Sequence, residues 1–249
     1  MLNVSREGRV LRVVLNRPEK RNALSGALCR ELVAAIEEGE RDSGIGAILL
    51  SGAGASFCSG MDLSEMLTPA EASLAEVHER LFTIGRRVTV PIVAAVHGAA
   101  LAGGTGLVAN AHIVVAAEDA TFGLTEIRIA LWPFVVYRSV VEAVGDRRAL
   151  ELAITGRIIG AHEAAGIGLA QYVTPSAGVM DRAGEIARAV AAASPVAMRS
   201  GMRFVAESRG MDWEEGGKTA RRVREELFRT NDFAEGVRAF REKRTPRWS

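Results

Sequence analysis

PIVAAVHGAALAGG, residues 91–104, is the most informative segment of this chain. Its apolar first half predicts a buried strand, and the Gly103-Gly104 pair predicts a sharp turn at which a helix begins. The first N–H groups of a helix have no acceptor within the helix, and the helix dipole adds positive potential there. Because glycine has no side chain, a ligand can approach this backbone closely. The turn therefore predicts a site for an anion, or for a carbonyl oxygen that becomes one during a reaction.

A second turn of the same kind lies upstream. The strand-like segment Ala47–Ser51 leads through a glycine-containing turn to SFCSGMDL, residues 56–63. Gly60 again permits close approach, and Asp62 can cap the helix that follows. Each turn by itself could simply pack a helix against a strand. Together they predict two backbone N–H groups that converge on one oxygen, which is an oxyanion hole built from main chain.

The composition is that of an ordinary globular protein. The chain has 249 residues, of which 48% are apolar and 24% charged, so one α/β domain with a helical appendage is expected. A net charge of +1 provides no electrostatic argument for binding nucleic acid or a membrane surface. Cys29 and Cys58 lack metal-ligand spacing, so we expect no metal and two reduced thiols in a cytoplasmic protein. The N-terminus does not resemble a signal peptide, and the apolar run 88–108 is interrupted by Pro91 and glycines, which argues against a membrane span.

Strands and helices alternate along the first part of the chain. A helix is expected from Ser25, and a second one from the capping signature Thr68-Pro69-Ala70-Glu71 to Arg87. This order predicts parallel crossovers with helices covering the sheet. From Pro133 onward the pattern is mostly helical, so we divide the chain into a core, 1–190, and a helical C-terminal region, 191–249. The predicted strands are Val10–Leu15, Ala47–Leu50, Ile92–Val96 and Ile113–Ala116.

Five motifs carry a resemblance to a known family. They are LNRPEKRNAL at 15–24, FCSGMDL at 57–63, HGAALAGG at 97–104, ATFGLTE at 120–126 and FREK at 240–243. In this order they resemble the crotonase superfamily, also called the enoyl-CoA hydratase/isomerase family. The resemblance implies an α/β spiral of ββα units with a helical C-terminal region that forms trimers, often paired into hexamers. It also implies an acyl-CoA thioester as substrate, with no separate cofactor, and an enolate-like intermediate.

The resemblance assigns roles to individual residues. The N–H groups of Met61 and Gly103 would hold the thioester oxygen, in agreement with the two turns, and Glu126 would be the catalytic acid–base. Lys243 matches a position that reaches a phosphate of CoA, often on a neighbouring subunit. The remaining positions expected to contact the substrate or its CoA are Arg21, Ala23, Leu24, Ser59, Gly60, Asp62, Leu63, Trp132 and Phe240.

One departure from the family pattern narrows the reaction. Hydratases of this family have a second glutamate in a Gly-Gly-X-Glu pattern, and Gly106 stands at that position. Hydration needs a water deprotonated and a proton delivered to C2, which two carboxylates do well. Moving a double bond from the 3,4 to the 2,3 position needs only one carboxyl group that takes a proton from C2 and returns it at C4. Glu126 alone therefore favours an enoyl-CoA isomerase.

Other functions remain open at this stage. A hydratase could take its second carboxylate from Asp62, Glu65 or Glu71, and thioester hydrolysis or decarboxylation would also suit the family. A catalytically silent CoA-binding subunit is a further alternative, against which the presence of Glu126 argues. Glu126 could also be a surface carboxylate at a helix start.

The missing glutamate suggests its own experiment. Gly106→Glu is expected to add weak hydration, because a side chain at position 106 should point into the cleft. Trp132 and Phe134 are expected to form the wall that limits access of water.

Overall fold

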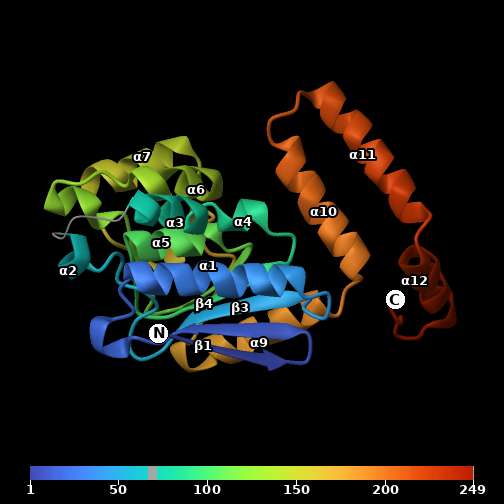
Figure 1. The fold of residues 1–249 in the computed structure, drawn as a ribbon, viewed down its shortest axis with the longest axis horizontal. Coiled ribbons are helices and arrows are strands. Elements are labelled where there is room, and N and C mark those ends of the chain that lie inside the picture. The colour runs from blue at the N-terminus through green and yellow to red at the C-terminus, as the bar shows by residue number, and fades with distance from the viewer. Residues whose placement is uncertain (67–71, 249) are drawn as a thin grey trace.

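The computed structural model describes residues 1–66 and 72–248. A six-stranded sheet with the order β1-β2-β3-β4-β6-β9 forms its centre (Figure 1). The pair β1–β2 is antiparallel and all other neighbours in this sheet are parallel, as the alternation of strands and helices predicted. The strands are β1 Leu2–Glu7, β2 Val10–Leu15, β3 Ala47–Gly52, β4 Ile92–Val96, β6 Ile113–Ala117 and β9 Tyr172–Thr174, and a smaller sheet holds β5 Ala99–Leu101, β7 Thr121–Gly123 and β8 Ile159–Gly160.

All four predicted strands are confirmed, each within two residues at its ends. Five of the six residues of β1 are exposed, so this edge strand has little of the apolar alternation from which a strand can be predicted. The central strands β3 and β4 are buried along almost their whole length. Such continuous apolar runs are typical of parallel strands covered on both faces.

Helices cover both faces of the main sheet. α9 packs small side chains, among them Ala183, Ala187 and Ala191, against β3, β4 and β6 on one face. α1 lies on the other face and begins at the predicted N-cap Ser25, whose Oγ accepts a hydrogen bond from the N–H of Leu28 (3.2 Å). The helices are α1 Gly26–Arg41, α2 Leu63–Met66, α3 Ala72–Leu81, α4 Ile84–Arg87, α5 Gly103–Asn110, α6 Phe134–Val144, α7 Asp146–Thr155, α8 Ala161–Gly166, α9 Val179–Ala191, α10 Pro195–Ser208, α11 Trp213–Phe228 and α12 Asn231–Glu242.

The helix predicted to run to Arg87 is interrupted. α3 ends at Leu81 and α4 starts at Ile84. The carbonyl of Phe82 lies at the break, where it accepts hydrogen bonds from Asn110 Nδ2 (2.9 Å) and Ser139 Oγ (2.5 Å). These side chains donate to the carbonyl that would accept a main-chain N–H in a continuous helix. The sequence pattern of a single helix cannot show such contacts with distant residues. The capping signature 68–71 lies outside the described residues.

The three C-terminal helices extend away from the sheet (Figure 1). α10, α11 and α12 make up most of residues 191–248, as expected for the C-terminal region that was predicted to be helical. The division of the chain near residue 190 remains a prediction. Within residues 1–66 and 72–248, no helix is long and apolar enough to cross a membrane.

Candidate active site

The two glycine-containing turns lie against each other. The N–H of Phe57 donates to the His97 carbonyl (2.9 Å), and the N–H of Leu101 donates to the Cys58 carbonyl (3.0 Å), so the two strand ends run side by side. Gly60 has φ +101°, and a Cβ built on it would lie 2.9 Å from the Cβ of Ala102. Only glycine fits there, because both the backbone conformation and the contact exclude a side chain. The convergence of the turns is therefore built into the main chain.

Both predicted oxyanion donors face one cavity. Leu24 forms a parallel bridge with Met61 through the Gly60 carbonyl and the N–H of Asp62, which leaves the N–H of Met61 on the side away from Leu24. Gly103 is the first residue of α5, where an N–H has no acceptor within the helix. Met61 and Gly103 line the same cavity, which has a volume of about 440 Å³. This arrangement suits two N–H groups that hold one carbonyl oxygen.

Glu126 provides a carboxyl group in this cavity. It lies in the 3₁₀ helix Thr125–Ile129 and is only 8% exposed. Its Oε2 is buried and has no hydrogen-bond partner among the described residues. Burial raises the pKa of the Glu126 carboxyl above its ordinary value, because the charged form loses water. The interpretation of Glu126 as a surface carboxylate is wrong, and a buried carboxylate with a raised pKa is a stronger base than an exposed one.

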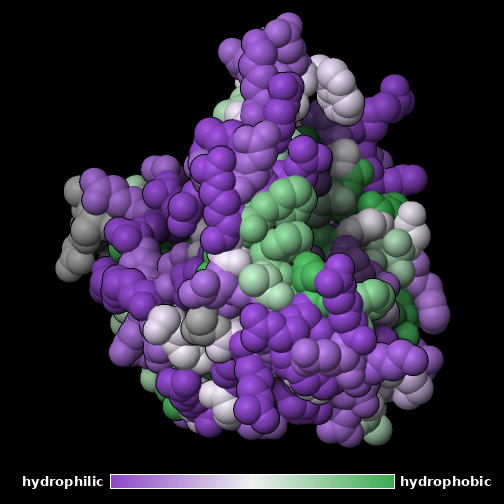
Figure 2. All heavy atoms as spheres, turned by 90° about the vertical axis from the view of Figure 1, so that its right-hand side faces the viewer, coloured by the Kyte–Doolittle hydropathy of each residue, from purple (hydrophilic) through white to green (hydrophobic). Residues whose placement is uncertain are grey.

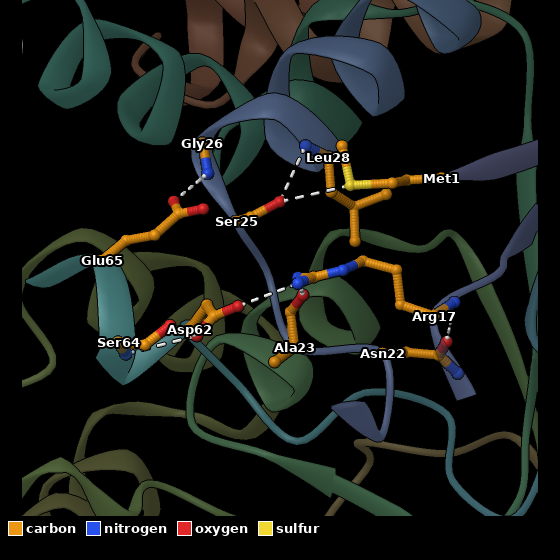
Figure 3. A network of polar contacts seen from close by, with 10 residues as sticks. All are labelled: Met1, Arg17, Asn22, Ala23, Ser25, Gly26, Leu28, Asp62, Ser64 and Glu65. Atoms are coloured by element: carbon orange, nitrogen blue, oxygen red, sulfur yellow. Dashed lines mark hydrogen bonds and ion pairs between the residues drawn. The ribbon is translucent and has the colours of Figure 1, made fainter. Parts of the chain in front are cut away.

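A polar network holds the first turn in place (Figure 3). Arg17 forms an ion pair with Asp62 (3.0 Å) and donates to the Ala23 carbonyl (2.6 Å). The hydroxyl of Ser64 and the guanidinium of Arg17 lower the pKa of Asp62. Glu65 accepts a hydrogen bond from the N–H of Gly26 at the start of α1 (2.8 Å). These bonds tie α2 and the Met61 turn to the N-terminal part of the chain.

Gly106 is covered by packed side chains. A Cβ at this position would lie 2.5 Å from Val136 Cγ1 and 2.9 Å from Phe82 Cδ1. Val136 and Phe82 are buried, whereas Phe134, which was expected to wall the cleft, is 73% exposed. Trp132 and Phe134 do line the cavity, as expected, but the atoms nearest to position 106 belong to Val136 and Phe82. The place of the second glutamate is occupied by Val136 of α6 and by Phe82, which follows the end of α3.

Several predicted substrate residues meet at the cavity, and others do not. Ser59, Asp62, Leu63 and Trp132 line it together with Met61, Gly103 and Glu126. Leu24 also lines it, Ala23 is buried beside the first turn, and Arg21 is exposed with φ 50°. Phe240 and Lys243 belong to the end of the chain around α12, which Figure 1 places at the opposite end of the molecule from α2 and α6. Within one chain these two residues do not reach the cavity.

Four further residues belong to this region, and none of them was expected from the sequence. Arg17 and Asn22 lie in the first quoted motif, and Asn22 Nδ2 donates to the carbonyls of Ala53 (2.9 Å) and Ser56 (2.8 Å). His78 and Phe82 line the cavity, His78 from α3 and Phe82 from the break that follows it. Their i, i+4 spacing, continued from Leu74, was the signal that could have placed them on one face. In the described part of the chain, no group of three or more His, Cys, Asp or Glu side chains could hold a metal ion.

Comparisons with known proteins agree with this geometry. The model of the family described as enoyl-CoA hydratase/isomerase matches residues 5–249. A putative enoyl-CoA hydratase of Thermus thermophilus is 36% identical, with 97% of this chain and 98% of that protein covered. The enoyl-CoA hydratase EchA19 of Mycobacterium tuberculosis is also 36% identical, with 98% and 94% covered. The crystal structure of an enoyl-CoA hydratase from Mycobacterium smegmatis superimposes with a TM-score of 0.94 at 30% identity, covering 99% of this chain and 98% of that one.

Proposed function

The chain belongs to the enoyl-CoA hydratase/isomerase family of acyl-CoA enzymes, and we propose that its reaction is the isomerisation of 3-enoyl-CoA to 2-enoyl-CoA. The observation that carries this proposal is that Glu126 is present in the cavity, whereas Gly106 stands where a second glutamate would be. Glu126 is buried with an unpartnered Oε2, while packed side chains cover the position where a second glutamate would stand.

The reaction needs one carboxyl group and one oxyanion site. The Glu126 carboxylate takes a proton from C2, and the electron pair of that C–H bond moves toward the thioester oxygen. The N–H groups of Met61 and Gly103 stabilise the resulting dienolate, and each such donor contributes about 3 kcal/mol. The protonated Glu126 then delivers the same proton to C4, which leaves the double bond between C2 and C3. No water and no second carboxylate take part.

Hydration is the competing function, because the relatives named above are called hydratases. It would require a second carboxylate beside Glu126. Asp62 is held by Arg17 and Ser64, and one oxygen of Glu65 accepts from Gly26, so both of these carboxylates have structural partners. Glu71 lies outside the described residues. This arrangement supports isomerisation over hydration.

The test compares two substrates and two variants. Purified protein is assayed for conversion of 3-hexenoyl-CoA and, separately, for addition of water to crotonyl-CoA. We expect isomerisation well above hydration, and Glu126→Gln is expected to lower kcat roughly 100-fold or more while CoA affinity is kept. Glu65→Gln, a matched change in the same cavity, should cost far less. Efficient hydration without isomerisation would refute the proposal, and near-normal turnover by Glu126→Gln would place the proton carrier elsewhere.

We also propose that the enzyme works as a trimer or hexamer. Large apolar side chains remain exposed on the last two helices, including Phe228 (53%), Phe233 (42%) and Phe240 (86%). Apolar side chains gather in a hollow bordered by polar ones on the face that Figure 2 shows. Association would cover these side chains and could bring Phe240 and Lys243 of one copy to the cavity of another.

A further inference from the structure

His78 is a polar group of the cavity that takes no part in the proposed reaction. It lies on α3, and its Nε2 is buried without a hydrogen-bond partner among the described residues. Glu126 Oε2, in the same cavity, is likewise buried without a hydrogen-bond partner among the described residues. A buried polar atom without a partner costs stability, because it has lost its hydrogen bonds to water and gained none in the protein. Proton transfer accounts for this cost at Glu126, but nothing in the reaction accounts for it at His78.

Phe82 is a neighbour of both the oxyanion turn and His78. Its Cζ would lie 3.2 Å from a Cβ built on Gly103, so Phe82 packs directly beside the turn. The ring of His78 lies one helical turn earlier, with its centroid 6.4 Å from that of Phe82. Its neighbours at the cavity wall on α3 are the apolar residues Leu74 and Ala75. An acyl chain whose thioester oxygen lies at Gly103, and which continues along the cavity past Phe82, would meet the imidazole.

The charges of the cavity restrict what His78 could bind. The ionisable side chains that line it besides His78 are Asp62, Glu65 and Glu126, and the described lining residues include no lysine or arginine. Asp62 is paired with Arg17, so a carboxylate on the acyl chain would meet the carboxyl groups of Glu65 and Glu126 with no cation among the lining residues. Burial lowers the pKa of His78, and the charge of Glu65 opposes this shift only in part. A neutral imidazole offers one donor and one acceptor, which suits a neutral oxygen.

We propose that His78 recognises a hydroxyl or oxo group on the distal part of the acyl chain, so that the site prefers oxygenated acyl-CoA thioesters to plain hydrocarbon ones. The inference rests on the proposed function for its substrate class. It concerns binding of the acyl chain, however, and can be measured without turnover.

The experiment uses saturated thioesters, which the isomerase reaction does not consume. Calorimetry gives the affinity of octanoyl-CoA and of the same chain with a hydroxyl at carbon 5, 6, 7 or 8. We expect one or two positional isomers to bind about twofold to tenfold more tightly than octanoyl-CoA, the range of one net hydrogen bond. His78→Leu should abolish this preference, and His78→Gln, which keeps hydrogen-bonding atoms, should retain part of it.

The outcomes separate this inference from the proposed function. Equal affinities for all isomers in the wild type, or an unchanged preference in His78→Leu, would overturn the role of His78. An equal loss of kcat for every 3-enoyl-CoA in both His78 variants, with unchanged affinities, would also overturn it, because His78 would then act in proton transfer. A wild-type preference that disappears in His78→Leu, in an enzyme that does not isomerise, would support the role of His78 and refute only the proposed reaction. If His78→Leu does not fold, the role of His78 is still tested by the preference of the wild type for particular hydroxyl positions and by its partial retention in His78→Gln.

Discussion

Gly106→Ala tests whether α5 and α6 are packed too closely for a side chain at the position of the missing glutamate. The added Cβ would lie 2.5 Å from Val136 Cγ1 and 2.9 Å from Phe82 Cδ1, whereas carbon atoms in contact prefer about 3.5–4.0 Å. Val136 is β-branched and has little rotamer freedom in a helix, and Phe82 is fully buried, so neither can move easily. Such overpacking costs about 1–3 kcal/mol. Alanine regains about 0.5–1 kcal/mol over glycine within a helix, so we expect a net loss on the order of 1–2 kcal/mol.

The assay is urea unfolding at fixed protein concentration, with Gly201→Ala as the matched control. Gly201 lies in α10, and a Cβ built on it meets no atom within 4 Å. The control should therefore gain about 0.5–1 kcal/mol, so the two glycine-to-alanine changes are expected to differ in sign. Equal free energies of unfolding for Gly106→Ala and Gly201→Ala would refute the packing argument.

The same contacts revise the expectation for Gly106→Glu. The sequence predicted a weak gain of hydration, but the structure leaves no room for the glutamate stem beside Val136 and Phe82. We now expect no hydration of crotonyl-CoA by the single variant. Gly106→Glu combined with Val136→Gly removes the Val136 atoms at 2.5 and 2.9 Å, and hydration should then become detectable. Hydration by the single variant, or a double variant that folds but remains inactive, would contradict this account, and Val136→Gly alone is the control.

Glu126→Gln should be more stable than the wild type at pH 8 and should lose this advantage below pH 4. Because the pKa of the Glu126 carboxyl is raised in the folded protein, the folded state favours the protonated form, which stabilises the wild type only in acid. This stabilisation is lost as pH rises through the folded pKa. Equal urea midpoints for the two proteins across this pH range would contradict it. Arg17→Leu should cost about 3–5 kcal/mol at pH 7, because it leaves Asp62 buried without its ion pair. This loss should shrink as pH falls through the lowered pKa of Asp62, and a loss independent of pH would contradict the pairing. Light scattering at micromolar concentration should give the mass of a trimer or hexamer, and a monomer would refute the proposed assembly.

Local patterns were sufficient for the main elements and for the oxyanion turns. The apolar runs of β3 and β4 and the capping residue Ser25 act through neighbours in the sequence, so they can be identified without a structure. The same holds for the glycines at 60 and 103, because a turn that brings backbone close to a ligand requires residues without side chains. The motif around Glu126 predicted a carboxyl group in the site, and the structure places it in the cavity.

Other features depend on groups from distant segments that meet only in the folded protein. The break after α3 depends on Asn110 and Ser139, which reach the Phe82 carbonyl from α5 and α6. No local pattern shows that a carbonyl will accept hydrogen bonds from side chains 28 and 57 residues away.

That position 106 carries no carboxylate follows from the amino-acid sequence alone, because a glycine has no side chain to hold one. That Phe82 and Val136 fill the space beside Gly106, and that His78 lines the same cavity as Glu126, depends on how distant segments pack in the folded protein. The physical reason is that composition determines which groups exist, whereas burial and unpaired hydrogen-bonding atoms arise only when separate segments pack together.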